Sequence, residues 1–523
     1  MVWRAEDPEG NEVAKVRWEL VPYTRGFGYD LGCGPNKGFP HFIGVDSGAD
    51  RKLFDRRMDP DLELPCDKLD KFASQSADFI FSSHLLEHIE DFKGALREWW
   101  RVIKVGGYLC LYLPHKDFYP NIGKDGANPD HKHDFHPNDI IEAMKEIGSG
   151  WDLVENQDRN EGTEYSFFQV YKKTSQRAHL RSCDDPKPEK TCAVVRYGAF
   201  GDLIMASSIL PQLKAEGYHI TLYSVDRGYE VVKHDPHIDK VILQDHEQVP
   251  NAALGDFFDY LAKHKYDRFI NLSESVEGTF LALPNRAPAR FPTEVRHRLM
   301  NVNYIEFTHL LAGVPHKPAQ KFYPTTEERE LARKVRQRMG GDYMVLWSLS
   351  GSAVHKHYPH MDAVMARLLV SRPDVRIVLA GGHECQIIEG GWEKEPRVFC
   401  RSGKWKIRET LAFLEFCDLV IGPETGVLNA AALMPMPKIV TLSHSSHENL
   451  TRDWVNVTAL EPKDTPCYPC HRMHYGFDTC TPGFIADPSK PGEMLRVGSL
   501  CQVNIGPDQM WDAIVPHLMK KAA

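Results

Sequence analysis

The chain has 523 residues, and at about 150 residues per domain this length predicts three or four folding units. Its 63 basic and 72 acidic residues leave a net charge of −9, which argues against a protein that coats nucleic acid through bulk positive charge. A hydrophobic content of 42%, with 35 prolines and 38 glycines, excludes disordered, collagen-like and low-complexity chains.

The N-terminal segment and the cysteine content indicate the compartment. Residues 1–10 include acidic side chains and no apolar core, unlike a secretory signal. The chain also lacks the run of about 18 apolar residues that predicts a membrane span. Twelve cysteines in this length are too few for a disulfide scaffold. We therefore expect a cytoplasmic protein without a membrane span, whose cysteine clusters are weighed as metal sites before disulfides.

The first chemical motif is D-x-G-x-G, formed by Asp30, Gly32 and Gly34 at the end of a predicted strand. The two glycines let the backbone approach a ligand that a β-carbon would block. A second predicted strand, residues 42–46, ends in Asp46, whose carboxylate can accept both hydroxyls of a ribose. The pattern predicts a small-molecule site where the two strands end.

A third predicted strand, residues 77–84, runs into a helix that opens with LLEHI at 85–89. Together the motifs DLGCGP, GVD and SSHxLEH resemble class I S-adenosylmethionine-dependent methyltransferases of the type 11 kind, over roughly residues 27–172. The resemblance implies a Rossmann-like domain that binds S-adenosylmethionine and methylates an acceptor. It implies six cofactor-binding residues: Asp30, Gly32 and Gly34 around the methionine part, Asp46 at the ribose, Asp61 near the adenine, and His84 facing the methyl donor.

Histidines gather in two later segments, residues 114–116 and 130–137. Because imidazole titrates near neutral pH, these side chains suit general bases beside an acceptor hydroxyl or amine. The spacing His131-x-His133 also suits metal ligands, and an exposed polar loop is the third interpretation. The N-P-P-Y and D-P-P-Y motifs of nucleobase amino methylation are missing from the sequence, which disfavours a DNA amino-methyltransferase.

A polar, charged and proline-punctuated stretch at residues 173–190 reads as a linker. On both sides of it, short apolar runs alternate with helical patterns, which predicts α/β units with parallel sheets. A softer break near residues 316–328 divides the second part. We therefore expect domains at residues 1–172, 191–325 and 326–523.

The second domain opens with a buried-type strand and a tight turn that contains Gly198 and Gly201. Asp202 then lies at the start of a predicted helix, at the carboxyl end of the strand, where open α/β sheets bind their ligands. A carboxylate there can take a proton from an acceptor hydroxyl. Plain capping of the helix is an equally good interpretation.

The third domain also has polar groups after its predicted strands. The strand at residues 345–352 ends in small hydroxyl residues and glycine, followed by Lys356, and such groups suit a diphosphate. Another strand, residues 417–422, leads into P-E-T-G at 423–426 and a helix. The partial positive charge of that helix start can stabilise a leaving phosphate.

Three stretches resemble glycosyltransferase family nine, the heptosyltransferase-like enzymes: R-x-G-A-x-G-D at 196–202, S-x-x-x-x-x-K-x-Y-P at 350–359, and E-T-G-x-x-N-A-A-A at 424–432. The resemblance covers roughly residue 190 to the C-terminus and implies a GT-B module of two Rossmann-like halves. By it Asp202 is the catalytic base and the donor is a nucleotide-diphosphate sugar. The donor-binding residues are Ser350, Gly351, Ser352, Lys356, Glu424, Thr425, Gly426 and Asn429. The family usually has Asp and His where Glu424 and Asn429 stand, so a heptose donor is not implied.

Four cysteines lie in the tail segment 467–501. The first two form a C-x2-C pair, which is a good first half of a tetrahedral thiolate site. A metal would help to order a segment so poor in apolar runs. Zinc and ordinary buried or free thiols are equally supported, ahead of an iron–sulfur cluster or disulfides. The candidate ligands are Cys467, Cys470, Cys480 and Cys501.

Two resemblances in one chain predict a bifunctional enzyme. It would transfer a sugar, with inversion, from a nucleotide-diphosphate sugar to the hydroxyl of a glycan, lipid-linked sugar or nucleoside, and would methylate the same or a related substrate. The alternative is a glycosyltransferase that acts on a hydroxylated nucleobase of DNA, as in phage-type modification, with the methyltransferase-like domain as a degenerate binding module. The arginines of residues 286–298 would line its basic channel. A non-enzymatic scaffold is the remaining interpretation, and the sugar, nucleotide, order of reactions and oligomeric state stay open.

Overall fold

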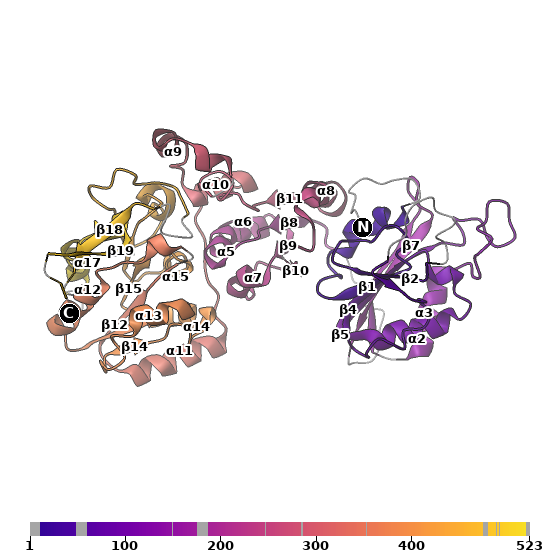
Figure 1. Ribbon diagram of the computed structural model, residues 1–523, viewed down its shortest axis with the longest axis horizontal. Coiled ribbons are helices and arrows are strands. Elements are labelled where there is room, and N and C mark those ends of the chain that lie inside the picture. Colours follow the sequence, from indigo (N-terminus) through magenta and orange to yellow (C-terminus); the bar gives the residue numbers. More distant parts are fainter. Residues whose placement is uncertain are drawn as a thin grey trace. The chain divides into compact units, whose positions relative to one another are not determined.

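The computed structural model describes residues 11–48, 60–148, 150–174, 187–245, 247–283, 286–351, 353–473, 480–487, 489–490 and 492–518. Contacts within the chain define two compact units. The first consists of Met1–Glu189 with Ile242–Asp267, and the second of Lys190–Val241 with Arg268–Ala523. Each unit contains sheets rich in parallel strands, accompanied by helices (Figure 1), so the predicted α/β class is confirmed.

The first unit contains a seven-stranded sheet in the order β3-β2-β1-β4-β5-β7-β6. The five strands from β3 to β5 in that order pair in parallel, whereas β7 is antiparallel to both of its neighbours. The strands are β1 (Gly28–Leu31), β2 (Ile43–Asp46), β3 (Leu62–Glu63), β4 (Ala77–Ser83), β5 (Ile103–Pro114), β6 (Trp151–Arg159) and β7 (Ser166–Lys173). Strands β1 and β4 are apolar and buried nearly throughout, as expected for parallel strands covered on both faces.

The helices of this sheet are short, apart from two. They are α1 (Glu12–Val16), η1 (Arg17–Leu20), η3 (Leu86–His88), α2 (Phe92–Val102) and α3 (Pro137–Ile147), and α2 and α3 lie side by side (Figure 1). The Asp91 side chain caps α2 by accepting the Gly94 N–H at 2.9 Å. Helix α2 then buries Trp99 and Trp100 in the core, which also contains Trp151.

Residues Ile242–Asp267 belong to the first unit although the sequence analysis places them in the domain at 191–325. They form η5 (Asn251–Ala253), α8 (Leu254–Tyr260) and the π-helix η6 (Leu261–Lys265). The fully buried Phe257 ring lies 5.7 Å from the Trp18 ring. Arg25 Nε lies 2.7 Å from Asp245 Oδ1. This segment therefore packs against the N-terminal residues of the first unit.

The second unit begins with a four-stranded sheet in the order β10-β9-β8-β11. Strand β8 pairs in parallel with β9 and with β11. The strands are β8 (Thr191–Val195), β9 (His219–Ser224), β10 (Lys240–Leu243) and β11 (Arg268–Asn271). The helices are α5 (Phe200–Ala206), η4 (Ser207–Ile209), α6 (Leu210–Ala215), α7 (Asp226–Val232), η7 (Ala287–Arg290), α9 (Thr293–Leu299) and α10 (Tyr304–Ala312).

A six-stranded, all-parallel sheet follows in the order β14-β13-β12-β15-β16-β17. Its strands are β12 (Tyr343–Ser348), β13 (Val375–Ala380), β14 (Val398–Cys400), β15 (Leu419–Pro423), β16 (Lys438–Thr441) and β17 (Val457–Leu460). The helices around it are α11 (Thr326–Met339), η8 (Val354–Lys356), α12 (Met361–Ser371), η9 (His383–Cys385), α13 (Gln386–Glu389), α14 (Ile407–Phe413), η10 (Leu414–Phe416), α15 (Gly426–Ala431), η11 (His447–Thr451) and α17 (Pro507–Leu518). One hydrophobic cluster contains Leu203 of α5 and Leu428 of α15, so the two sheets of this unit share a core.

The C-terminal part carries an antiparallel hairpin of β18 (Pro482–Ala486) and β19 (Met494–Ser499), followed by α16 (Leu500–Val503). The cysteines predicted as metal ligands lie before and after this hairpin. Among the described residues, none of the helices combines the length and the apolar character needed to cross a bilayer.

Candidate active sites

The carboxyl ends of β1 and β2 lie side by side because the two strands pair in parallel. At that edge Asp46 accepts two backbone hydrogen bonds, from the Gly34 N–H at 3.1 Å and the Gly48 N–H at 2.8 Å. Gly32 has a φ of +71°, and a β-carbon on it would lie 2.9 Å from the side chain of Leu85. The turn therefore requires glycine, and it brings the predicted ribose acid to the Gly-rich loop.

Asp30 is 1% exposed and carries a carboxylate oxygen that is not used within the described structure. Its Oδ2 accepts the Gly38 N–H at 2.8 Å, while its Oδ1 accepts no hydrogen bond from any described residue. Burial raises the pKa of the Asp30 carboxyl to about 7, and the negative charge of Asp46 adds to the rise. A buried acid with an open oxygen suits a cationic group, so these residues fit the ammonium group of S-adenosylmethionine.

The other two predicted cofactor residues lie next to the strands β3 and β4. Asp61 precedes β3, and its Oδ2 accepts Lys37 Nζ and the Gly44 N–H, both at 2.7 Å. Partial burial opposes ionisation of Asp61, but the two donors hold the pKa of its carboxyl below the ordinary value. His84 follows β4, and its Nε2 lies 2.9 Å from Ser166 Oγ. Burial lowers the pKa of His84 to about 3, so its imidazole is neutral at pH 7.

The side chains of His131 and His133 contact different parts of the first unit. The His131 ring lies 4.8 Å from the His88 ring, nearly perpendicular to it. His133 Nε2 instead lies 3.1 Å from two main-chain carbonyls, so the structure does not bring the His131-x-His133 pair together. Sequence reasoning gave no role to Glu87 or His88, although the L-E-H letters of the third motif contain both.

Asp202 lies in the first turn of α5 with both carboxylate oxygens engaged. Its Oδ2 accepts the Ala199 N–H at 2.7 Å, and its Oδ1 lies 3.1 Å from Arg196 Nη2. Arg196 is buried and also pairs with Glu277 at 2.8 Å. Asp202 therefore caps α5, while 27% of its side chain stays exposed at the carboxyl end of β8.

Lys356 is the last residue of η8, and its side chain reaches the turn before α15, where Nζ donates to the Glu424 carbonyl at 2.9 Å. Burial lowers the pKa of the Lys356 ammonium, whereas the charges of Glu424 and Asp202 raise it. Lys356 is therefore within electrostatic reach of the predicted base. A β-carbon on Gly351 would lie 2.9 Å from Lys356 Cδ and 3.4 Å from Thr425 Cγ2, so the glycine loop lies directly against these side chains.

Two more predicted donor residues are tied to the same helix. Thr425 Oγ1 accepts the Leu428 N–H at 3.4 Å, and Asn429 Nδ2 donates to the Thr425 carbonyl at 3.1 Å. Ser350 Oγ donates to the Gly351 carbonyl at 3.3 Å, and Ser352 lies outside the described residues. Gly351, Lys356, Thr425 and Asn429 are thus gathered around one helix start.

Glu424 faces away from this group. Its Oε1 accepts the N–H groups of Ser443 and Ser445 at 3.1 and 3.0 Å. Its Oε2 accepts Ser443 Oγ at 2.7 Å and pairs with His444 Nδ1 at 2.5 Å. Burial opposes the charge of Glu424, but His444 and Lys356 hold the pKa of its carboxyl below the ordinary value. The Glu424 carboxylate anchors the loop after β16. The sequence did not predict this role, because Ser443, His444 and Ser445 follow Glu424 by 19 or more positions.

The predicted cysteine ligands lie in one neighbourhood. Cys470 and Cys501 are buried, Cys467 and Cys480 are partly buried, and all four are free thiols. Burial raises the pKa of Cys470 to about 12, and negative charge on Cys467 and Cys480 would raise it further. Among the described residues, however, their sulfur atoms form no group of three within 4.8 Å of one another.

The arginines of residues 286–298 do not form a shared channel. Arg286 pairs with Glu274. Arg296 is 2% exposed and donates through Nε to the Cys470 carbonyl at 3.0 Å. Arg286, Arg290 and Arg298 are exposed, and of these Arg286 is neutralised by its ion pair.

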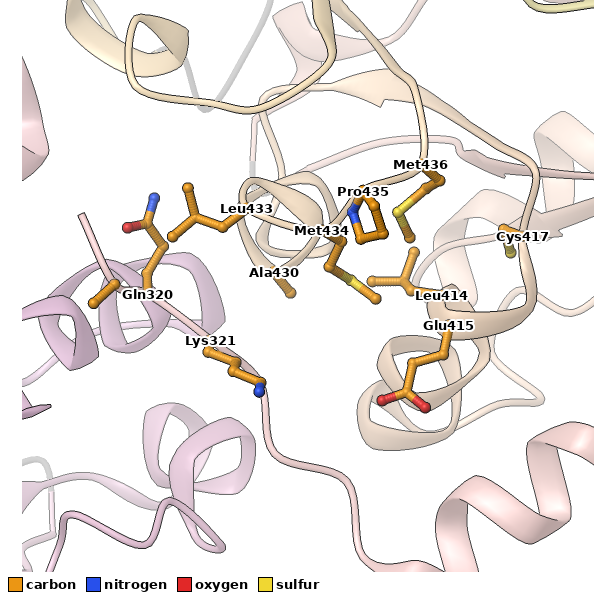
Figure 2. Close-up of a pocket in the computed structure, with 11 residues that line it drawn as sticks. Gln320, Lys321, Leu414, Glu415, Cys417, Ala430, Leu433, Met434, Pro435 and Met436 are labelled. Atoms are coloured by element: carbon orange, nitrogen blue, oxygen red, sulfur yellow. The ribbon is translucent and has the colours of Figure 1, made fainter. Parts of the chain in front are cut away.

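A separate pocket of about 540 Å³ lies in the second unit (Figure 2). Its apolar lining comes from the end of α15 and the turn after it, and Lys321 and Glu415 lie at its edge. The lining residues are Ala319, Gln320, Lys321, Leu414, Glu415, Cys417, Ala430, Leu433, Met434, Pro435 and Met436. None of the predicted donor-binding residues lines this pocket.

Residues 29–111 match a family model described as a methyltransferase domain. The match contains β1 to β4 and most of β5, with the turn of Gly32 and the acid Asp46. It confirms the recognition of a methyltransferase domain and the expectation that the chain is a transferase. Among curated proteins, none matches the chain.

Several solved structures resemble the chain. A glycosyl transferase family 9 protein from Veillonella parvula DSM 2008 is 16% identical, with 64% of this chain and 99% of that chain covered and a TM-score of 0.46. ADP-heptose lps heptosyltransferase II of E. coli is 14% identical, with 64% and 100% covered and a TM-score of 0.44. A SAM dependent methyltransferase from Archaeoglobus fulgidus is 18% identical, with 31% and 92% covered and a TM-score of 0.24. These structures belong to the two families recognised in the sequence, but identities and TM-scores this low carry no argument about activity.

Proposed function

We propose that the chain is a transferase with two active sites. The first unit would be an S-adenosylmethionine-dependent methyltransferase, and the second an inverting glycosyltransferase that uses a nucleotide-diphosphate sugar. The domains would be residues 1–172, 191–325 and 326–523, with the linker 173–190 between the two activities and with Ile242–Asp267 of the second range packed into the first unit. The observation that best supports the first activity is Asp30 Oδ1, a buried oxygen at the Gly-rich turn that no described residue uses.

In the first unit, S-adenosylmethionine supplies an electrophilic methyl group when it is bound. Asp30 would hold its ammonium group, and the bare backbone at Gly32 and Gly34 would allow the close approach. Each oxygen of Asp46 accepts one backbone hydrogen bond, which leaves lone pairs for the ribose hydroxyls. His84 is neutral and so would not repel the positively charged sulfonium.

Asp61 is the weakest member of the proposed cofactor set. Its Oδ2 is taken by Lys37 and by the backbone of β2, so it would contribute at the adenine through Oδ1. A carboxylate can still accept a hydrogen bond on that second oxygen.

In the second unit, Asp202 would accept the proton of the acceptor hydroxyl as that oxygen attacks the anomeric carbon of the donor. The bond to the nucleotide diphosphate breaks, and Lys356 would stabilise the departing negative charge. Arg196 would hold the Asp202 carboxylate in position through their ion pair. Glu424 would take no part in donor binding, since both of its oxygens are used by the loop after β16.

The proposed acceptor is a glycan, a lipid-linked sugar or a nucleoside, and the proposed location is the cytoplasm. The DNA alternative needs an exposed basic channel. Because Arg286 and Arg296 are engaged within the unit, no observation favours that alternative.

The two activities can be tested separately by thermal unfolding of the full chain. A ligand that binds only the native state stabilises it by about 2.7 kcal/mol at 100 times its dissociation constant. We expect S-adenosylmethionine, and one of the diphosphates ADP, UDP and GDP, each to raise the melting temperature. Asp30→Asn should abolish only the first shift and Lys356→Met only the second. A chain that S-adenosylmethionine does not stabilise would contradict the methyltransferase proposal.

Structural zinc at Cys467, Cys470, Cys480 and Cys501 is a separate proposal, supported by their neighbourhood and burial. Zinc binding would deprotonate these thiols and draw the sulfur atoms together. The double substitution Cys467→Ser with Cys470→Ser should remove one equivalent of zinc from the purified chain. Equal zinc contents in the two proteins would identify the cysteines as ordinary thiols.

A further inference from the structure

The segment after β4 contains a buried carboxylate that lacks a partner. Glu87 lies in the short helix η3 and is 0% exposed. Neither of its carboxylate oxygens accepts a hydrogen bond from any described residue. Burying an ionised carboxylate without a partner costs several kcal/mol, so such a group needs a proton or a cation.

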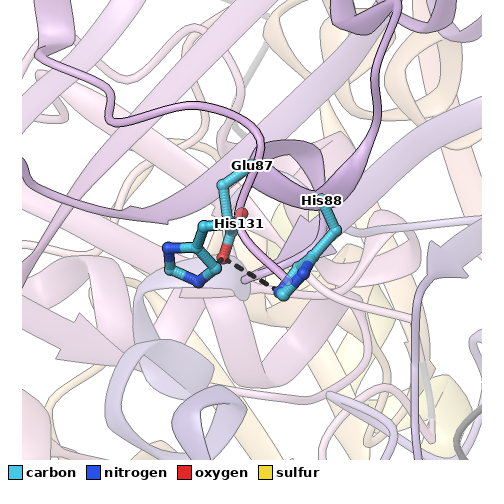
Figure 3. Close-up of side chains that lie close together, drawn as sticks. All are labelled: Glu87, His88 and His131. Carbon is cyan, nitrogen blue, oxygen red and sulfur yellow. Dashed lines mark ion pairs between the residues drawn. The ribbon is translucent and has the colours of Figure 1, made fainter. Parts of the chain in front are cut away.

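Three imidazole nitrogens face one oxygen of this carboxylate. His84 Nδ1, His88 Nε2 and His131 Nε2 each lie 3.9 Å from Glu87 Oε1. This distance is too long for a hydrogen bond, so the groups surround a space instead of pairing directly. Figure 3 shows Glu87, His88 and His131 converging from η3 and from the loop that follows β5.

The main chain holds this arrangement in place. The Glu87 carbonyl accepts the Lys132 N–H at 2.7 Å and the His133 N–H at 3.2 Å, which fixes the loop of His131 against η3. The His84 ring is oriented by its hydrogen bond to Ser166, so that its other nitrogen points to Glu87. The cluster is therefore built by contacts between segments 40 or more positions apart.

We propose that Glu87, His88 and His131 bind a divalent transition-metal ion such as zinc. Their ligand atoms all lie within 4.8 Å of one another. A tetrahedral zinc ion with ligand bonds of about 2.1 Å holds its ligand atoms about 3.4 Å apart. The two histidine–Glu87 distances of 3.9 Å would have to shorten by about half an ångström to reach this spacing. Two imidazole nitrogens and one carboxylate oxygen form a common ligand set for such an ion.

The state of the side chains suits metal binding. The positive ion would compensate the buried charge of Glu87. The His88 side chain is 31% exposed, which gives an ion a path from solvent. Three protein ligands also leave a coordination position open for water or a substrate oxygen.

The site goes beyond the proposed methyl transfer, and metal binding does not depend on that function. It lies directly after β4, next to His84, at the sheet edge where the proposed cofactor residues gather. A metal ion there would lower the pKa of a hydroxyl that it coordinates, as zinc does for water. If the methyltransferase proposal holds, the open position would receive the acceptor oxygen.

The test is cobalt binding to the full chain, freed of metal by a chelator and without a histidine tag. The Cys467→Ser, Cys470→Ser background removes two of the four proposed thiol ligands. A Co²⁺ spectrum without the charge-transfer band of a thiolate then identifies a nitrogen and oxygen site. We expect one equivalent of Co²⁺ to bind and Zn²⁺ to displace it. Glu87→Gln and His131→Asn in this background should weaken binding by about a hundredfold, and the matched control His133→Gln should leave it unchanged.

Thermal unfolding of the same samples separates metal binding from folding. Metal-free Glu87→Gln should melt at or near the temperature of its parent, because the substitution replaces a buried carboxyl that accepts no hydrogen bond from any described residue. Zinc should stabilise only the parent. His88→Asn, at the most exposed ligand, provides a second loss of binding if either buried variant unfolds. Unaltered Co²⁺ affinity in the ligand variants, or a parent that binds no Co²⁺, would overturn the site. The shift with S-adenosylmethionine, measured in parallel, reports the methyltransferase proposal independently.

Discussion

Gly426 lies directly against Gly201: a β-carbon added to Gly426 would come within 3.1 Å of the Gly201 backbone nitrogen and 2.9 Å of Phe200 Cβ. The first turns of α15 and α5 therefore meet with no side chain between them. One helix carries the proposed diphosphate residues and the other carries the proposed base. The glycines of the two motifs explain how both sets reach the same place within the second unit.

This contact predicts that a methyl group added at Gly426 lowers the stability of the second unit more than one added at Gly201. Gly426→Ala should destabilise the second unit by about 1–3 kcal/mol, since the new carbon meets backbone and Cβ atoms that cannot rotate away. Gly201→Ala should cost less, because the one tight contact of its β-carbon is with the end of the Asn429 side chain at 3.1 Å, and the Gly426 backbone lies at an ordinary distance of 3.6 Å. Urea unfolding measures both.

Gly255→Ala is the matched control, since a β-carbon there meets nothing within 4 Å and alanine favours the helix. Equal losses of stability in all three variants would show that the two helix starts are not in close contact.

Asp202→Asn should lower sugar transfer by about a hundred- to ten-thousandfold, because the amide cannot accept the proton of the acceptor. The stabilisation by the nucleotide diphosphate should persist, since Lys356 is unchanged. The nearby first-turn acid Asp226 of α7 is the control, and Asp226→Asn should keep the transfer rate. Full turnover in Asp202→Asn would reduce Asp202 to a cap of α5.

The raised pKa of the Asp30 carboxyl predicts that the stability of the ligand-free chain depends on pH. Burial raises this pKa from 3.8 to about 7, so the folded state keeps a proton that the unfolded state has already lost. The contribution of Asp30 to stability is therefore present below pH 4 and is lost as the pH rises to about 7. The difference in unfolding free energy between the parent and Asp30→Asn should fall across this range and level off above it.

The same carboxyl should release a proton when a cation binds beside it. Calorimetry of S-adenosylmethionine binding near pH 6.5, in buffers of different ionisation enthalpy, measures this release. Binding without proton release would place the ammonium group away from Asp30.

The burial of Phe257 predicts that the segment Ile242–Asp267, far along the sequence, stabilises the first unit. Phe257 is fully buried and its ring lies 5.7 Å from that of Trp18. Phe257→Ala should destabilise this unit by about 3–5 kcal/mol and lower its melting temperature. The adjacent Phe258 is only partly buried, so Phe258→Ala should cost less. A loss in Phe257→Ala no greater than in Phe258→Ala would mean that the inserted segment contributes little to the core.

The sequence by itself determined the local parts of this protein. The alternation of strand, turn and helix placed Asp30, Gly32 and Asp46 at strand ends, because these patterns depend on residues within one short stretch. The same holds for Asp202 at the start of α5 and Thr425 at the start of α15. Parallel pairing of strands then brought each set to one sheet edge.

Only the tertiary structure decided which distant groups meet. Glu424 reads as a donor-site acid in its motif, yet its longer side chain reaches the loop at Ser443 and is fully satisfied there. His131 reaches Glu87 from the loop after β5, far from the segment of His84 and His88, and Ile242–Asp267 joins the first unit across the linker. Such contacts arise from packing of elements far apart in the chain, and no spacing within a single motif encodes them.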